Sequence, residues 1–260
     1  MRMEKSHENY KELIWMLVKT DFKLRYQGSF LGYIWAILSP LLTFAVLNFV
    51  FSSVFARGNG AEYYPLQLLI GIMTFTFFSD GTRAGLGSLV AKSRLVTKIY
   101  VPRWVLIFAS TMNTGMLFLM NLIVLVIFFI FYRFLPSLEA ILFFVLLVVL
   151  MYVVILGFSF LTAAFYVRFR DLSMIWAVIV RALFYATPII YPIQVMPEYI
   201  QKVILLSPIG FIVHFSKESL INNHFPEIWQ FMLFVVASFA FLFIGIFIHK
   251  KTIKKIAENI

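Results

Sequence analysis

Long uncharged stretches alternate with short basic segments along the 260 residues of the chain. A helix rises about 1.5 Å per residue, so about 20 apolar residues are needed to cross roughly 30 Å of hydrocarbon. Four stretches meet that length outright: 26–56, 104–132, 140–167 and 228–248. Each of them is predicted to be a transmembrane helix.

Two further stretches complete a prediction of six transmembrane helices. Residues 63–79 reach the required length if the helix continues past Asp80 and Arg83, which would place an i,i+3 charged pair inside it. Residues 172–187 are shorter and are interrupted by Arg181. An arginine inside a membrane span is a functional candidate by default, and the alternative is an arginine paired with a neighbouring carboxylate or helix carbonyls. Both interpretations of Arg181 stay open.

The stretch between the fifth and the last span breaks its own helical pattern. It begins YATPIIYPIQVMP at 185–197, with Pro188, Pro192 and Pro197 close together. Helix-start signals stand at Pro197-Glu198 and Ser207-Pro208, and a helix-end signal stands at Asn222-Asn223. Irregular backbone is tolerated at membrane depth only where protein buries it or where it lines a water-filled cavity. Residues 188–226 are therefore predicted to form two short re-entrant helices in the outer leaflet.

The net charge of +10 follows the predicted spans. With six spans, 17 of the 22 Lys and Arg residues fall on one side of the membrane. The positive-inside rule then places both termini in the cytoplasm, and a seventh span is rejected because it would put the C-terminal KKTIKK outside. Nucleic-acid binding is disfavoured because no soluble domain carries the charge, whereas the basic face suits anionic lipid headgroups. The basic loop at 88–104 is either a docking segment for a soluble partner or a solvated turn.

The polar start of the chain carries a helical repeat. Within residues 8–25, apolar side chains recur at i, i+3, i+4 and i+7, namely Tyr10, Leu13, Ile14, Leu17, Val18 and Leu24. This pattern predicts an amphipathic helix, either lying along the inner membrane surface or packed against the cytoplasmic ends of the bundle. Lys23 and Arg25 close the helix where the first span begins, a position suited to meeting a phosphate.

The sequence offers no catalytic constellation. It contains no cysteine, and its four histidines have neither metal-site spacing nor an acid at a fixed offset. GTRAGLG at 81–87 lacks the Lys-Ser/Thr pair of a phosphate-binding loop, and its small residues favour close helix packing instead. An enzyme, such as a membrane-bound glycosyl or acyl transferase, is therefore a disfavoured alternative.

Two helix faces are candidates for lining a path. On the first span Tyr33, Phe44 and Phe51 share an aromatic face, which suits sugar rings but is explained as well by lipid or helix contact. On the fifth span Arg181 and Tyr185 share a face. Together they indicate a transport pathway more than a reaction centre.

Four stretches of the chain resemble the membrane subunits of ABC-2 type exporters, closest to the permeases of O-antigen, capsular polysaccharide and teichoic acid transporters. They are RYQGSFLGYIWAILSPLL at 25–42, YYPLQLLIGIMTFTFF at 63–78, SLVAKSRLVTKIYVPR at 88–103 and FRDLSMIWAVIVRALFYATPIIYPIQVMP at 169–197. Because they recur in the family's order and spacing over nearly the whole chain, the resemblance is specific at the level of the family.

The resemblance implies an all-α membrane protein with the ABC-2 type, or type V exporter, fold: six transmembrane helices, an N-terminal amphipathic interface helix, and two re-entrant helices before the last span. The single transmembrane domain (1–260) would consist of a cytoplasmic interface helix (1–29), spans 1 to 5 (30–187), periplasmic re-entrant gate helices (188–226), span 6 (227–249) and a cytoplasmic tail (250–260). The chain would lie in the bacterial cytoplasmic membrane with both termini inside.

The resemblance also implies a half-transporter. Two copies of the chain would form the channel, and two copies of a cytoplasmic ABC ATPase would bind ATP and Mg²⁺, so that this chain itself holds no cofactor. The cargo would be a polysaccharide linked to undecaprenyl pyrophosphate, either O-antigen-like, capsular or teichoic acid. An ABC-2 exporter of a drug or a small lipid is the alternative within transport.

Each step of such a transport has candidate residues. They are Lys23, Arg25 and Arg83 where the pyrophosphate enters; Tyr33, Phe44, Phe51, Arg181 and Tyr185 along the channel; Pro188, Tyr191 and Pro192 at the periplasmic gate; and Lys92, Arg94, Lys98, Arg168 and Asp171 for coupling to the ATPase. No catalytic or metal site is expected in this chain.

Overall fold

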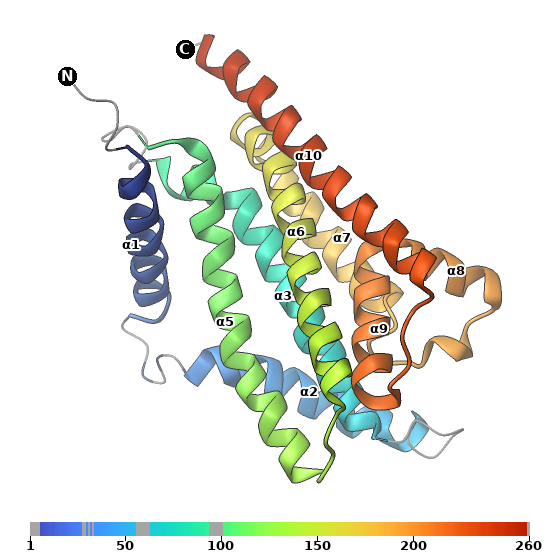
Figure 1. Cartoon of the computed structure of the whole chain (residues 1–260). Coiled ribbons are helices and arrows are strands. Elements are labelled where there is room, and N and C mark those ends of the chain that lie inside the picture. The colour runs from blue at the N-terminus through green and yellow to red at the C-terminus, as the bar shows by residue number, and fades with distance from the viewer. Residues whose placement is uncertain are drawn as a thin grey trace.

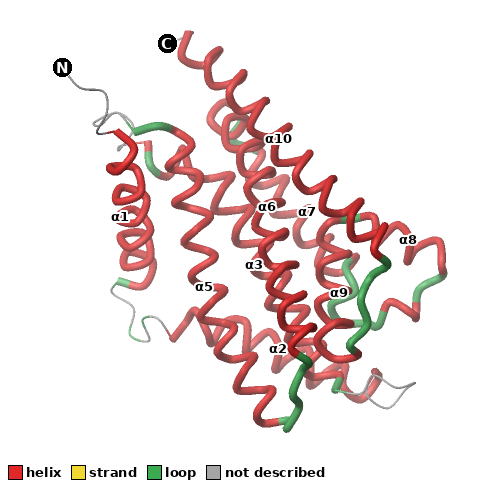
Figure 2. Tube along the Cα trace, viewed as in Figure 1, coloured by secondary structure: helices red, strands yellow, loops and turns green. Residues whose placement is uncertain are grey.

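The computed structural model describes residues 6–27, 30, 32, 34–55, 63–93 and 101–258. Within these ranges the backbone forms helices joined by loops, with no strand (Figure 2). The helices are α1 (Ser6–Tyr26), α2 (Ile34–Phe55), α3 (Tyr64–Ala91), α5 (Arg103–Phe131), α6 (Leu138–Arg168), α7 (Leu172–Ala186), α8 (Glu198–Leu206), α9 (Pro208–Asn222) and α10 (Ile228–Glu258), with a 3₁₀ turn at Ile193–Val195. The all-helical prediction is confirmed for this part of the chain.

Four of these helices are long and apolar enough to cross a membrane, namely α2, α5, α6 and α10. Among the others, α3 has 28 residues, which is about 42 Å of helix, and α7 has 15. Helices α8 and α9 taken together are also long and apolar enough to cross a membrane, but their axes bend by 105° at the junction between them. Four helices, or five with the bent pair, are thus candidate spans by their length and composition, while the count of six spans stays a prediction.

Helix α3 is the central element of the fold. It packs against α5, α6 and α9 (Figure 1). Many of its side chains, such as Leu66, Leu68 and Leu69, are fully buried. Its buried hydroxyls are satisfied locally, since Thr74 and Thr82 each donate a hydrogen bond of 2.8 Å to a carbonyl one turn earlier. A polar side chain satisfied within its own helix adds little cost to a buried position.

Glycines allow α3 and α10 to approach α6 closely. A Cβ atom on Gly85 would lie 1.8 Å from the Ser159 hydroxyl oxygen, and one on Gly81 would lie 2.8 Å from a methyl carbon of Ile155. In the contact between α10 and α6, a Cβ on Gly245 would lie 2.3 Å from the Gly157 carbonyl oxygen. The prediction that the glycines of 81–87 serve helix packing is therefore confirmed for Gly81 and Gly85.

Helix α1 is attached to the bundle by its apolar face. It packs against α5, and Tyr10, Leu13 and Ile14 contact the buried cluster that includes Val101 and Val105 (Figure 1). The ring of Tyr10 meets that of Trp104 edge-on, with 5.9 Å between the centroids. Of the two predicted placements of this amphipathic helix, attachment to the bundle is confirmed, and a position along the membrane surface stays a prediction.

The two ends of the described chain lie at the same end of the bundle, where α3 also leads toward α5 and α6 toward α7 (Figure 1). Helix α2 lies across the bundle near the opposite end (Figure 1). This arrangement of the two ends agrees with the prediction from the charge distribution that both termini lie on one side. The cytoplasmic assignment of that side stays a prediction.

The proline-broken segment begins and ends its helices at the predicted residues. Pro197 precedes α8, Ser207 precedes α9 with Pro208 as its first residue, and Asn222 ends α9. Asn223 follows in the left-handed conformation, with φ of 53°, which asparagine adopts more readily than most residues. The local signals for two short helices are therefore confirmed, whereas their re-entry into the membrane stays a prediction.

Candidate functional site

A basic pocket lies where the last turns of α1 meet the second half of α3 and the first half of α5. Its volume is about 410 Å³. The charged residues of its lining are Asp21, Arg25, Arg83 and Lys92, and the polar ones are Ser88, Ser110, Asn113 and Thr114. The remaining lining residues are Leu24, Ala84, Gly87 and Ala91. Three cations against one carboxylate give the lining a positive charge.

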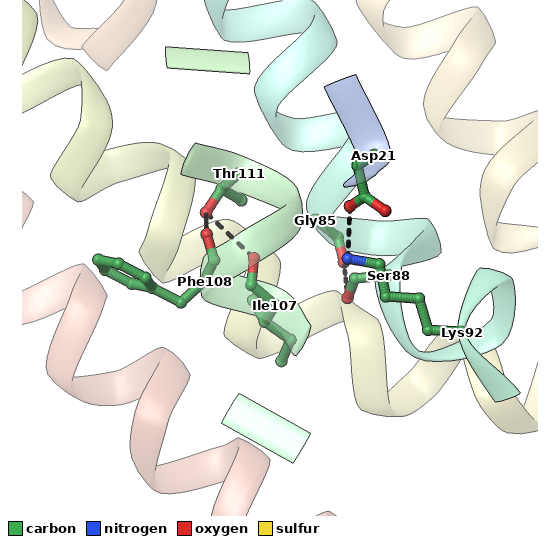
Figure 3. A network of polar contacts seen from close by, with 7 residues as sticks. All are labelled: Asp21, Gly85, Ser88, Lys92, Ile107, Phe108 and Thr111. Carbon is green, nitrogen blue, oxygen red and sulfur yellow. Dashed lines mark hydrogen bonds and ion pairs between the residues drawn. The ribbon is translucent and has the colours of Figure 1, made fainter. Parts of the chain in front are cut away.

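Two ion pairs hold α1 beside α3 at this pocket. The Lys92 ammonium lies 2.5 Å from the Asp21 carboxylate, and this lysine is only 8% exposed (Figure 3). Arg25 reaches Asp80 at 3.9 Å, while its guanidinium remains partly exposed. Arg83 is exposed and has no carboxylate within 4.0 Å in the described part of the chain. The pocket therefore has one arginine without an ion-pair partner there and one held loosely.

The predicted continuation of the second span past Asp80 and Arg83 is confirmed, because α3 runs to Ala91. Within 4.0 Å in the described part of the chain, Asp80 meets Arg25 of α1 and not Arg83 at i+3. The reason is tertiary, because α1 places a long cationic side chain within reach of a carboxylate on α3. A pairing rule based on one isolated helix cannot include that neighbour.

Neutral polar side chains form the α5 wall of the pocket. Ser110, Asn113 and Thr114 share one face at i, i+3 and i+4. Thr114 donates a hydrogen bond of 2.6 Å to the Thr111 carbonyl. Ser88 on α3 donates one of 2.7 Å to the Gly85 carbonyl (Figure 3). Asn113 is 8% exposed, and its Oδ1 atom has no hydrogen-bond partner among the residues that the structure describes.

Sequence patterns alone do not reveal this polar wall. The signal that would have found it is a group of three hydrogen-bonding residues on one face of α5, a helix that is otherwise strongly apolar. Such a group resembles ordinary helix packing until a pocket is seen beside it. Only the position of α1 and α3 makes it part of a site.

The candidates for pyrophosphate binding are only partly brought together. Arg25 and Arg83 line the same pocket, whereas Lys23 is exposed in the last turn of α1 and is not part of the lining. Lys92, a candidate for ATPase coupling, is buried in the pocket wall and paired with Asp21.

The other coupling candidates lie elsewhere or outside the described residues. Arg168 ends α6, and Asp171 stands in the exposed turn before α7, at the same end of the bundle as the chain termini (Figure 1). Arg94 and Lys98 lie outside the described residues, as does the channel candidate Tyr33.

The channel candidates divide between the interior and the surface of the single chain. Phe44 is buried and meets Phe128 edge-on at 5.2 Å, and Phe51 is half-buried against the same core. Arg181 and Tyr185 are instead exposed on α7. The described residues provide no carboxylate within 4.0 Å of Arg181, so the carboxylate-paired interpretation of this arginine finds no partner among them.

The gate candidates belong to a turn that is anchored on several sides. Buried Lys217 of α9 donates a hydrogen bond to the Pro188 carbonyl, and Tyr64 of α3 donates one of 2.9 Å to the Ile190 carbonyl. The Tyr191 hydroxyl donates to the Ala186 carbonyl at 3.0 Å, so it closes the turn back onto the end of α7. Pro188 is buried and Pro192 is half-buried. These contacts give the turn after α7 one defined conformation.

Comparison with known proteins places the chain in a family. Residues 12–217 match the family model described as ABC-2 type transporter. The chain therefore belongs to the ABC-2 type transporter family, and its family resemblance is confirmed.

Relatives match it over almost their entire length. An O-antigen export system permease protein RfbA of Klebsiella pneumoniae is 26% identical over 95% of this chain and 94% of the relative. A protein of the same name from Myxococcus xanthus is 24% identical over 100% of both chains. The polysialic acid transport protein KpsM of Escherichia coli is 22% identical over 94% of each.

Proposed function

We propose that the chain is the membrane permease subunit of an ATP-driven exporter that moves an undecaprenyl-pyrophosphate-linked polysaccharide across the cytoplasmic membrane. The relatives that share its length are named for O-antigen export and polysialic acid transport, which supports a polysaccharide as cargo. The observation that carries the proposal is the basic pocket between α1, α3 and α5.

A pyrophosphate headgroup fits the charge of this pocket. Arginine donates paired hydrogen bonds to phosphate oxygens, and Arg25 and Arg83 both line the cavity. Asp80, which holds Arg25 at 3.9 Å, is a carboxylate that a phosphate oxygen would replace. The pyrophosphate would thus replace Asp80 as the anionic partner of Arg25. It would also provide an anionic partner for Arg83.

The proposed homodimer would cover the exposed face of α7. That face carries Met174 at 73%, Val178 at 68% and Tyr185 at 65% exposure, with exposed Arg181 among them. An arginine facing lipid costs about 2.5 to 3.5 kcal/mol on insertion scales. A second copy of the chain would turn this face toward a shared, hydrated conduit, and Arg181 and Tyr185 would line it.

The proposed ATPase subunits would bind at the end of the bundle that holds both termini. Coupling is assigned to the segment that contains Lys92, Arg94 and Lys98 and to the turn with Arg168 and Asp171. Movement passed to Lys92 would reach Asp21 directly, because the two side chains form an ion pair in the pocket wall. ATPase closure would in this way act on the headgroup pocket.

The proposed gate is the anchored turn after α7 together with α8 and α9. Pro188, Tyr191 and Pro192 would close the periplasmic end of the conduit. The 105° bend between α8 and α9 supports this role, because a continuous helix cannot both line a conduit and cover its end.

The cargo class is tested by ATP hydrolysis of the complete transporter in lipid nanodiscs. Polyprenyl pyrophosphate carrying a short glycan is expected to raise the hydrolysis rate about 2- to 10-fold, the range of a coupling free energy of about 0.5 to 1.4 kcal/mol. Small hydrophobic drugs are expected to leave the rate unchanged. Stimulation by the drugs and none by the lipid-linked glycan would contradict the proposal in favour of a drug exporter.

The dimer face is tested by cysteine crosslinking, to which only introduced cysteines of this chain contribute because the sequence has no native cysteine. A Val178→Cys variant is expected to form covalent dimers in membranes with a flexible bis-maleimide that can reach across the conduit, and Met174→Cys provides a second position on the same face. Val236→Cys on α10 is the matched control, since Val236 is 65% exposed and Val178 is 68% exposed. Equal crosslinking at Val236 and Val178, or none at either α7 position in an active transporter, would exclude α7 as the dimer face.

A further inference from the structure

Asn113 is a buried amide whose hydrogen-bonding capacity the described chain does not use fully. It is 8% exposed, it lines the basic pocket, and its Oδ1 atom has no partner. Leaving a buried acceptor unpaired destabilises the fold, and native structures contain few such groups. A group that costs stability within the fold and lines a pocket is a candidate for ligand binding.

The pocket lining contains two kinds of hydrogen-bonding group. Arg25 of α1 and Arg83 of α3 offer positively charged donors. The hydroxyl protons of Ser88 and Thr114 are already donated to carbonyl oxygens, so these two residues offer acceptor lone pairs. The side chain of Asn113 belongs to the same lining, and its Oδ1 atom is buried and has no partner among the described residues. A complementary ligand carries an anion next to groups that donate hydrogen bonds.

A sugar attached to a phosphate has this combination of groups. Its phosphate oxygens accept from arginine, and its ring hydroxyls donate to neutral oxygens. A bare polyprenyl phosphate supplies the anion but no hydroxyl donors. The volume of about 410 Å³ lies in the lower part of the range of about 300 to 1,000 Å³ seen for ligand pockets, which suits one headgroup and one sugar.

We infer that Asn113 is a specificity-determining residue that binds a hydroxyl of the first sugar, the one attached to the pyrophosphate. This inference rests on the proposed function and assigns the sugar-contacting side of the same pocket. The amide turns about its Cβ–Cγ bond, which exchanges Oδ1 and Nδ2, so its oxygen can be presented to the ligand. Thr114, one position further along α5, contributes a second acceptor on the same wall.

The experiment compares two lipids of equal charge that differ in the first sugar. Binding of polyprenyl pyrophosphate carrying one hexose, and of a sugar-free lipid in which a methyl ester replaces the hexose on the same polyprenyl pyrophosphate, is measured on the complete transporter in nanodiscs. The wild type is expected to bind the hexose lipid about 3- to 10-fold more tightly, the range of one net hydrogen bond. Asn113→Leu is expected to abolish this preference and to leave the affinity for the sugar-free lipid unchanged.

Asn121→Leu is the matched control. Asn121 lies in the same helix, is 9% exposed, and also has an Oδ1 atom without a partner, but it does not line the pocket. Both substitutions remove a buried, unpaired amide from α5, so a general effect on the helix would appear in both. The preference for the hexose lipid is expected to persist in Asn121→Leu.

The outcomes separate this inference from the function on which it rests. If the wild-type transporter binds both lipids equally, the inferred role of Asn113 is wrong, while the proposed function is not contradicted. This comparison needs no variant. An Asn113→Leu variant that keeps the preference, or loses affinity for both lipids equally, also overturns it. Binding of neither lipid by the wild type would instead contradict the proposed cargo itself.

Discussion

Replacing Arg25 or Arg83 with alanine is expected to lower the export rate of lipid-linked glycan by about 10- to 100-fold at subsaturating substrate. Each arginine lines the basic pocket, and loss of one charge-assisted hydrogen bond to a phosphate is worth about 1.5 to 3 kcal/mol. Because both side chains would bind the same headgroup, the effects in the double variant are expected to be less than additive. Export is measured in vesicles that contain the permease and its ATPase.

Two controls isolate the charge effect. Lys11→Ala removes another exposed cation from α1, and no change in export is expected because Lys11 lies outside the pocket lining. Asp80→Asn breaks the 3.9 Å ion pair with Arg25 but keeps both arginines. Export is expected to persist or rise in this variant, since the anion that competes for Arg25 is gone. If Asp80→Asn impaired export as strongly as Arg25→Ala, the ion pair would matter for structure and the pocket would lose its assigned role.

Replacing Gly210 with alanine is expected to lower the stability of the fold strongly. The added Cβ would lie 2.1 Å from the carbonyl oxygen of Ile204, across the bend between α8 and α9. That carbonyl cannot easily move, because it accepts the hydrogen bond of 3.1 Å from the Ser207 N–H that forms the turn. The bend must therefore open, at a cost of about 2 to 3 kcal/mol.

The same substitution at Gly115 is the matched control, and it is expected to raise stability instead of lowering it. A Cβ there would meet nothing within 4 Å, so alanine only removes the conformational freedom of glycine in a helix and adds about 0.5 to 1 kcal/mol of stability. The thermal unfolding midpoint of the purified permease is expected to fall for Gly210→Ala and to hold or rise for Gly115→Ala. A fall of similar size in both variants would show that the bend is not the sensitive element.

Gly210→Ala also tests the gate, because a widened bend would move α8 relative to α9. Ion leakage through permease-containing vesicles is expected to increase relative to Gly115→Ala vesicles. Unchanged leakage in a variant whose stability has fallen would separate the bend from the seal of the conduit.

Helix boundaries were predictable from the sequence where their signals are local. Ser207-Pro208 starts α9 and Asn222 ends it, because a proline in the first turn and an asparagine in the left-handed conformation act through their own backbone. The long apolar helices α5 and α6 were predictable for a similar reason, since hydropathy over about 20 residues is a property of one segment.

Partners across helices were not predictable in the same way. Asp80 pairs with Arg25, more than fifty positions away, instead of Arg83 at i+3, and Lys92 pairs with Asp21. Each of these contacts depends on where α1 lies against α3 and α5, which no pattern within a single helix encodes. The basic character of both segments was visible in the sequence, but the pairing was not.

The sequence by itself determined that this chain is a bundle of apolar helices with a broken segment before the last one, because hydropathy, proline and capping residues act over a few turns of chain. The tertiary structure alone decided which charged groups share a pocket and that the buried amide of Asn113 belongs to its lining. The physical reason is that a binding pocket is made where three separate helices meet, whereas a helix is made largely by its own neighbours.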